Sequence, residues 1–181
     1  VFKDWIKRKG YEHGFSCNKT YRADLFNFIR FPEGEVFEDT YVTPMLYESA
    51  YNVYYSDCGF YYYYKNEGSI SNSYSFKTQY FLFRNTVSLY EKVNDTYKLH
   101  DEAKELLLHC LDRLTDLHRC SDGEKSEYLK ARKMLKGRKI STNELFNMHI
   151  PTARKIKFII YALFGTKAHC CLFAMLKKKL C

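Results

Sequence analysis

The sequence predicts an α/β chain, with a few strands in its N-terminal part followed by an α-helical extension. Nine of the 17 tyrosines fall between Tyr41 and Tyr64, in aromatic runs that are typical of strands. From Ser75 onward, apolar residues recur every three or four positions, which is the period of amphipathic helices. The length of 181 residues can bury a core, and 18% aromatic residues exclude a disordered chain.

The N-terminal part is predicted to alternate short helices, strands and turns. Pro32 presets φ and Gly34 accepts a positive φ, so the segment between them favours a turn. A helix is expected to begin after Phe37 and to continue to about Ala50. The predicted strands are Phe15–Tyr21, Tyr51–Ser56 and Phe60–Lys65, with short helices over Val1–Lys9 and Arg22–Ile29.

The second half is predicted to contain four amphipathic helices. Ser141 and Glu144 have the spacing of a capping box, so the fourth helix should begin there. The apolar stripes of the first three helices lie within residues 76–90, 103–117 and 125–136. The chain therefore divides into residues 1–74, a helical extension over 75–140, and a basic, apolar tail over 141–181.

The positive charge of the chain is concentrated at its C-terminal end. Residues 125–181 carry 14 basic and two acidic side chains, although the whole chain has a net charge of only +8. Residues 150–181 add two apolar runs that are each too short to span a bilayer. This combination predicts contact with an anionic membrane surface. We therefore expect a cytoplasmic protein that attaches to the inner face of the cell membrane. Alternatively, these helices pack onto the domain and their lysines are solvated.

Other partners and sites are less compatible with the composition. Aliphatic residues fill the basic tail, which disfavours nucleic acid as its partner. The seven cysteines form no CxxC pair and have no Cys/His zinc spacing, so we expect free thiols in a reducing compartment.

Five blocks carry a resemblance to a known family, and all lie between Asn18 and Ser71. In order and spacing they resemble the second half of family 2 glycosyltransferases, bacterial enzymes of surface-polysaccharide synthesis. The resemblance implies the C-terminal part of a GT-A fold and an inverting sugar transfer. The donor would be a nucleoside-diphosphate sugar, and the acceptor a hydroxyl of a glycan or a lipid-linked molecule. The blocks are 18–22, 30–34, 37–39, 61–65 and 68–71.

The resemblance also implies roles for single residues. Asp39 would be the general base, and Glu38 would orient neighbouring groups or the acceptor. The helix dipole should keep a carboxylate at this position ionised, although Asp39 could also be no more than a helix cap. The residues that correspond to substrate-binding positions are Asn18, Lys19, Lys65, Ser69 and Ser71. For Asn18 and Lys19, strand-end hydrogen bonding or a surface charge is at least as good an explanation, and Lys65 could be a solvated lysine of a turn.

The family's first half has no counterpart in this sequence. That half holds the donor nucleotide and an Asp-x-Asp motif for a divalent metal, Mg²⁺ or Mn²⁺, which we expect in the full-length enzyme. No ligands for this metal are identified in the chain. The sequence thus predicts a piece of a larger glycosyltransferase that alone binds donor poorly and turns over little or nothing. The alternative is a non-catalytic, basic helical module that binds membrane surfaces or acidic partners.

Overall fold

The computed structural model describes residues 1–59, 61–64 and 74–178, and within these ranges it contains helices and loops but no strand. The α-helices are α1 (Phe2–Lys7), α2 (Asp39–Ser49), α3 (Phe76–Glu91), α4 (His100–Arg119), α5 (Lys125–Met134), α6 (Thr142–Asn147) and α7 (Thr152–Lys178). Two 3₁₀ turns, η1 (Gly10–His13) and η2 (Ala23–Asn27), and a π-helical turn, η4 (Lys92–Thr96), complete the elements.

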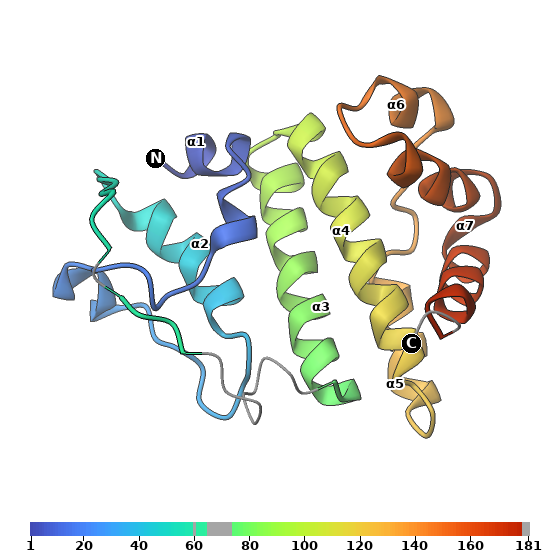
Figure 1. Ribbon diagram of the computed structural model, residues 1–181, viewed down its shortest axis with the longest axis horizontal. Coiled ribbons are helices and arrows are strands. Elements are labelled where there is room, and N and C mark those ends of the chain that lie inside the picture. Colours follow the sequence, from blue (N-terminus) through green and yellow to red (C-terminus); the bar gives the residue numbers. More distant parts are fainter. Residues whose placement is uncertain (60, 65–73, 179–181) are drawn as a thin grey trace.

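The two longest straight helices form the centre of the molecule. α3 and α4 lie side by side, joined by the π-helical turn η4 (Figure 1). α2 packs against α3 on one side, and α7 packs against α4 on the other (Figure 1). The N-terminal loops and α2 therefore form one flank of the helical hairpin, and the basic tail forms the other.

A stripe of leucines on α4 forms the main core, as the spacing of three and four residues predicts. Leu107, Leu111 and Leu114 are buried, and they meet Phe83 and Val87 of α3. Burial of one such side chain contributes about 1.5–3 kcal/mol. The predicted helices of this region are confirmed, and so is the capping box at α6. There the Ser141 N–H donates to Glu144 Oε2 at 2.8 Å, and the Glu144 N–H donates to Ser141 Oγ at 3.2 Å.

The α/β fold class is wrong for the described residues. The segment Phe15–Tyr21 contains a turn in place of a strand, and Tyr51–Ser56 and Tyr61–Tyr64 are irregular and exposed. Phe60 and Lys65, the ends of the last predicted strand, lie outside the described residues. Strand propensity reflects packing on a pleated surface, and a strand is stable only when a neighbour satisfies its backbone groups. Within the described ranges no such neighbour exists, so the aromatic composition does not produce a sheet.

A small second cluster fixes the N-terminal loops on α2. Ile29, Val42 and Leu46 are buried there, with Phe26 and Phe31 packed against them. The predicted turn is confirmed, since Gly34 has a φ of 71°. The predicted helix to about Ala50 is confirmed as well, because α2 ends at Ser49. These contacts bring the loop before α2 back along the same helix.

Gly165 interrupts α7 with a φ of 78° and a ψ of −176°, so two helical segments meet at this residue. The stretch Thr152–Met175 is long enough and apolar enough to cross a membrane by length and composition, which differs from the sequence-based expectation. Of its most apolar window, 28% is buried inside the molecule. The break lets the second segment bring Cys170 to Thr115 of α4, with 3.8 Å between the sulfur and Oγ1.

Replacement of Gly165 by alanine is expected to destabilise the protein by about 1–3 kcal/mol. A Cβ at this position meets no atom within 4 Å, so the cost arises from the backbone conformation, which is almost restricted to glycine. Urea unfolding of the variant measures this loss. Gly59→Ala is the matched control, because Gly59 also has open space around it but no positive φ. Equal stability of the two variants would contradict this role of Gly165.

Candidate functional site

Asp39 is the first residue of α2 and lies half-buried under the N-terminal loop. The N-cap position belongs to Glu38, whose side chain makes no capping hydrogen bond. The interpretation of Asp39 as the helix cap therefore does not fit the structure. The backbone amides of Thr40 and Ser16, which come from two separate segments, act on the Asp39 carboxylate and favour its charged form.

The surroundings of Asp39 raise its pKa above the ordinary value. Burial is the largest cause, and the charge of Glu38 acts in the same direction. The backbone amides of Thr40 and Ser16 and the positive charge of Lys19 lower the pKa, but they do not outweigh burial. This direction is opposite to the one expected from the helix dipole alone. A carboxylate with a raised pKa is a stronger base, which suits a group that accepts a proton.

Lys19 lies near Asp39, but its ammonium group binds oxygen atoms of the loop to which Lys19 itself belongs. It donates hydrogen bonds to Phe15 O at 2.6 Å, His13 O at 3.0 Å and Asn18 Oδ1 at 2.7 Å. A lysine ammonium has three hydrogens, so these bonds use its full donor capacity. Burial is the main cause that lowers the pKa of Lys19, while the charge of Asp39 raises it. A structural role thus explains Lys19 and Asn18 better than direct substrate contact.

Two further hydrogen bonds fasten this loop. The buried hydroxyl of Thr43, one turn into α2, donates to Gly14 O at 2.7 Å. The Tyr21 hydroxyl donates to Ser16 O at 3.5 Å, and the nearby Asp39 charge contributes to its raised pKa after burial. The loop that contains Ser16 is thereby held near the Asp39 carboxylate.

The short segment before Asp39 forms the other side of the site. Hydrogen bonds and an ion pair attach this segment to α3. Phe37 has a φ of 56°, an uncommon conformation for a non-glycine residue. Asn85 Nδ2 donates to Phe37 O and to Thr40 Oγ1, each at 3.2 Å. Arg84 forms a two-pronged ion pair with Glu35, in which Nη1 and Oε1 are 3.0 Å apart. Neither Arg84 nor Asn85 was among the site residues expected from the sequence, because both lie outside the apolar stripe of α3.

Asn85→Leu is expected to destabilise the protein by about 1–3 kcal/mol, because it removes a 2% exposed amide whose Nδ2 donates to Phe37 O and Thr40 Oγ1 and so ties this segment to α3. The segment before Asp39 should then lose protection against amide hydrogen exchange. Chemical unfolding and hydrogen exchange measure the two effects. Asn52→Leu, at an exposed position of an irregular segment, is the control. Unchanged protection at Thr40 and Tyr41 would show that Asn85 does not hold this segment.

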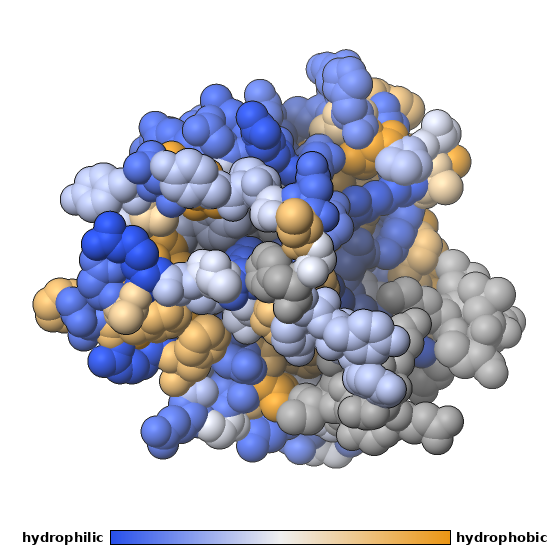
Figure 2. Space-filling view, turned by 60° about the vertical axis from the view of Figure 1, so that its left-hand side comes forward, coloured by the Kyte–Doolittle hydropathy of each residue, from blue (hydrophilic) through white to orange (hydrophobic). Residues whose placement is uncertain are grey.

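Exposed aromatic rings follow the C-terminal end of α2. Tyr51 is 95% exposed and Tyr54 is 90% exposed, whereas strands were expected for this cluster. Tyr47 marks the buried end, stacked on Trp5 at 4.7 Å between ring centroids. Burial, together with the electrostatic effect of Tyr55, raises the pKa of Tyr47 to about 12. Figure 2 shows this flank of the molecule, where hydrophobic residues are exposed among hydrophilic ones.

The structure thus brings together some of the predicted site residues. Asp39 and Lys19 lie within electrostatic reach of each other, Glu38 precedes Asp39 directly, and Asn18 is bonded to Lys19. The other three predicted positions, Lys65, Ser69 and Ser71, lie outside the described residues.

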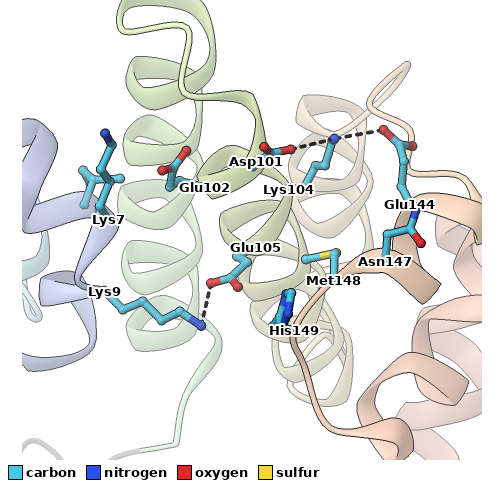
Figure 3. Close-up of a pocket in the computed structure, with 11 residues that line it drawn as sticks. Lys7, Lys9, Asp101, Glu102, Lys104, Glu105, Glu144, Asn147, Met148 and His149 are labelled. Carbon is cyan, nitrogen blue, oxygen red and sulfur yellow. Dashed lines mark hydrogen bonds and ion pairs between the residues drawn. The ribbon is translucent and has the colours of Figure 1, made fainter.

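A cleft of about 530 Å³ lies elsewhere, between α1, α4 and α6 (Figure 3). Ion pairs cross it, with Lys9 Nζ 2.8 Å from Glu105 and Lys104 Nζ 3.1 Å from Asp101. Lys104 also approaches Glu144, at 3.2 Å. Most of these charges are paired with one another, and Asp39 does not line the cleft. Across the described part of the chain, no group of three or more His, Cys, Asp or Glu side chains could hold a metal ion.

The fold and the site together define a helical protein in which the half-buried Asp39 carboxylate lies at the start of α2. The hydrogen-bonded N-terminal loop lies beside this carboxylate. Comparison with known protein families, with curated proteins and with solved structures finds no match to this chain.

Proposed function

We propose that this chain supplies the general base and the acceptor side of an inverting glycosyltransferase, with Asp39 as the base. The observation that carries the proposal is the half-buried Asp39 carboxylate at the start of α2, with the Ser16 backbone and the Lys19 charge acting on it. Its sequence context resembles that of the base in family 2 glycosyltransferases. The pKa direction supports the assignment, because burial strengthens Asp39 as a proton acceptor.

The proposed reaction is a single displacement. As the acceptor hydroxyl oxygen attacks the anomeric carbon of the donor, its proton moves to a carboxylate oxygen of Asp39. The bond between the anomeric carbon and the diphosphate oxygen breaks, and its electron pair leaves with the nucleoside diphosphate. Attack from the face opposite the leaving group inverts the anomeric configuration. Glu38, the residue before the base, would orient the acceptor or neighbouring groups.

A divalent metal is a proposed cofactor of the full-length enzyme, where it would neutralise the leaving diphosphate. The described residues do not fit this role, since they form no cluster of metal-ligating side chains. We therefore assign no ligand of this metal to the chain.

The exposed tyrosines provide a reason to place the acceptor beside Asp39. Tyr55 acts electrostatically on Tyr47, and Tyr21 acts on Tyr47 and is itself affected by the Asp39 charge. Asp39 begins α2 and the aromatic segment follows its last residue, so Tyr21 and Tyr47 lie between the base and this segment. Rings that face solvent present large, rigid surfaces with a polar hydroxyl, which can pack against sugar rings. A saccharide that packs against these rings would place one of its hydroxyl groups near α2.

The test uses the protein encoded by the complete gene, with a panel of nucleoside-diphosphate sugars and saccharide acceptors. Release of nucleoside diphosphate measures transfer, and proton NMR of the product gives the anomeric configuration. An inverted product supports the proposal. A retained configuration, or no transfer with any donor and no saccharide-induced NMR shift at Asp39, would overturn it.

A further inference from the structure

The first segment of α7 carries an apolar stripe on the side that faces away from the core. Its members are Ile156, Ile160, Leu163 and Phe164, at positions i, i+4, i+7 and i+8 of one helical face. Ile156 is 61% exposed, Leu163 62% and Phe164 71%. The opposite face of the same segment is also apolar, and Phe158 and Tyr161 are buried there.

A helix that is apolar on both faces requires cover on both. Here α4 and α6 cover the inner face only. The neighbouring helix α6 adds another exposed ring, Phe146, whose carbonyl accepts a hydrogen bond from Lys155 Nζ at 2.6 Å. The outward stripe of α7 and Phe146 of α6 therefore belong to two helices that are fastened to each other.

The charge of the part of the chain that carries this stripe indicates what covers it. Residues 125–181 have a net charge of +12, with only Glu127 and Glu144 as acidic side chains. Two of the basic groups, Arg154 and Lys157, pair with Asp112 of α4 and face the inner side. Lys167 is exposed just beyond Gly165. An apolar stripe in a strongly basic region fits a surface that is apolar inside and negatively charged outside.

We propose that the outward stripe of α7 inserts into the interface of an anionic lipid bilayer, with the helix parallel to the membrane plane. The break at Gly165 and the packing of the inner face on α4 keep the helix on the surface, although its composition would allow a span. The basic residues contribute about 1 kcal/mol each when they lie near anionic headgroups. This inference does not depend on the assignment of Asp39.

Vesicle flotation of the full chain tests the proposal. Phosphatidylglycerol-containing vesicles should bind the protein at low salt, and pure phosphatidylcholine vesicles should bind it far more weakly. The variant Ile156→Ser/Leu163→Ser/Phe164→Ser removes three exposed side chains and should lose binding by about tenfold or more. Phe28→Ser/Tyr51→Ser/Tyr54→Ser, on the opposite flank, is the matched control and should bind as the parent protein does.

A second measurement tests membrane insertion with single substitutions, so that misfolding of the triple variant cannot explain the result. Phe164→Trp should show a blue-shifted fluorescence maximum with anionic vesicles, whereas Phe28→Trp should not. Equal binding of the triple variant and its control, or no blue shift at position 164, would overturn the proposal. Dimers that dissociate in the triple variant, without vesicle binding by the parent protein, would identify the stripe as a protein interface and also overturn it.

Discussion

Asp39→Asn is expected to reduce glycosyl transfer by about 10²–10⁴-fold, the usual contribution of a general base. Asparagine has nearly the same shape as aspartate, and its Oδ1 is still a hydrogen-bond acceptor. It cannot accept a proton from the acceptor hydroxyl at neutral pH. The loss should therefore appear in kcat, measured with the protein that the complete gene encodes, while donor binding stays the same.

The fold should survive this change. Because burial opposes the charged form of Asp39, a neutral side chain there removes a desolvation cost, and the Tm should stay equal or rise. Glu38→Gln is the matched control. It removes the neighbouring carboxylate but leaves the base, so its effect on kcat should be smaller. Transfer at nearly the parental rate by Asp39→Asn would exclude Asp39 as the base.

The helical hairpin is the part of the fold that could be predicted from the sequence. Leucines of α4 recur with the helical period, and each helix of that region buries one continuous face. Local signals were sufficient at Ser141 and at Gly34, because a capping box and a positive φ each depend on a few neighbouring residues. Such features need no knowledge of distant contacts.

The presence of strands could not be predicted in the same way, because a strand needs a neighbouring strand, and local propensity does not show whether one exists. Tyr51 and Tyr54 have the composition of a strand, yet they are exposed in an irregular segment. The loop around Lys19 shows the competing effect. Its ammonium group satisfies three oxygens of the loop itself, and such local hydrogen bonds favour a compact turn over an extended strand.

The candidate site was predictable only in part, for a similar reason. A carboxylate at the start of a helix is a local feature, so Asp39 could be identified in advance. The groups around it come from elsewhere: the Ser16 backbone from a loop 23 residues earlier, and the Asn85 amide of α3, which binds the neighbouring Phe37 and Thr40. Burial by these segments reverses the pKa direction that the helix dipole alone suggests. Tertiary contacts thus decide the chemical character of a residue whose position the local sequence already predicts.

Acidification from pH 7 to pH 5 is expected to destabilise the protein through His169 of α7. The ring is fully buried, stacked on Phe158 at 5.1 Å between centroids and beside Phe173 at 5.0 Å. Burial is the main cause that lowers the pKa of His169 to about 4, the charge of Lys157 acts in the same direction, and Asp112 opposes both. The folded protein therefore holds this imidazole neutral and excludes the proton.

The sign of the effect follows from the two pKa values. In the unfolded chain His169 titrates near its ordinary value of 6.5, so the unfolded state binds more protons between pH 6.5 and pH 4. Stability is fully present above pH 6.5 and falls as the pH decreases through this window, by about 3 kcal/mol in total. Burial also lowers the pKa of His109, which adds a loss in the same direction.

Urea unfolding at pH 7, 6 and 5 measures this loss, and His169→Phe separates it from other titrations. Phenylalanine fits an aromatic neighbourhood and binds no proton, so the variant should lose less stability on acidification than the parent protein. Glu48 and Glu144 do not affect this comparison, because their pKa values are lowered in the folded protein. Their contributions to the free energy of unfolding are therefore lost only at more acidic pH. An equal loss in the parent and the variant would place the acid sensitivity elsewhere. A smaller loss would show that the packing of α7 on α4 requires a neutral imidazole.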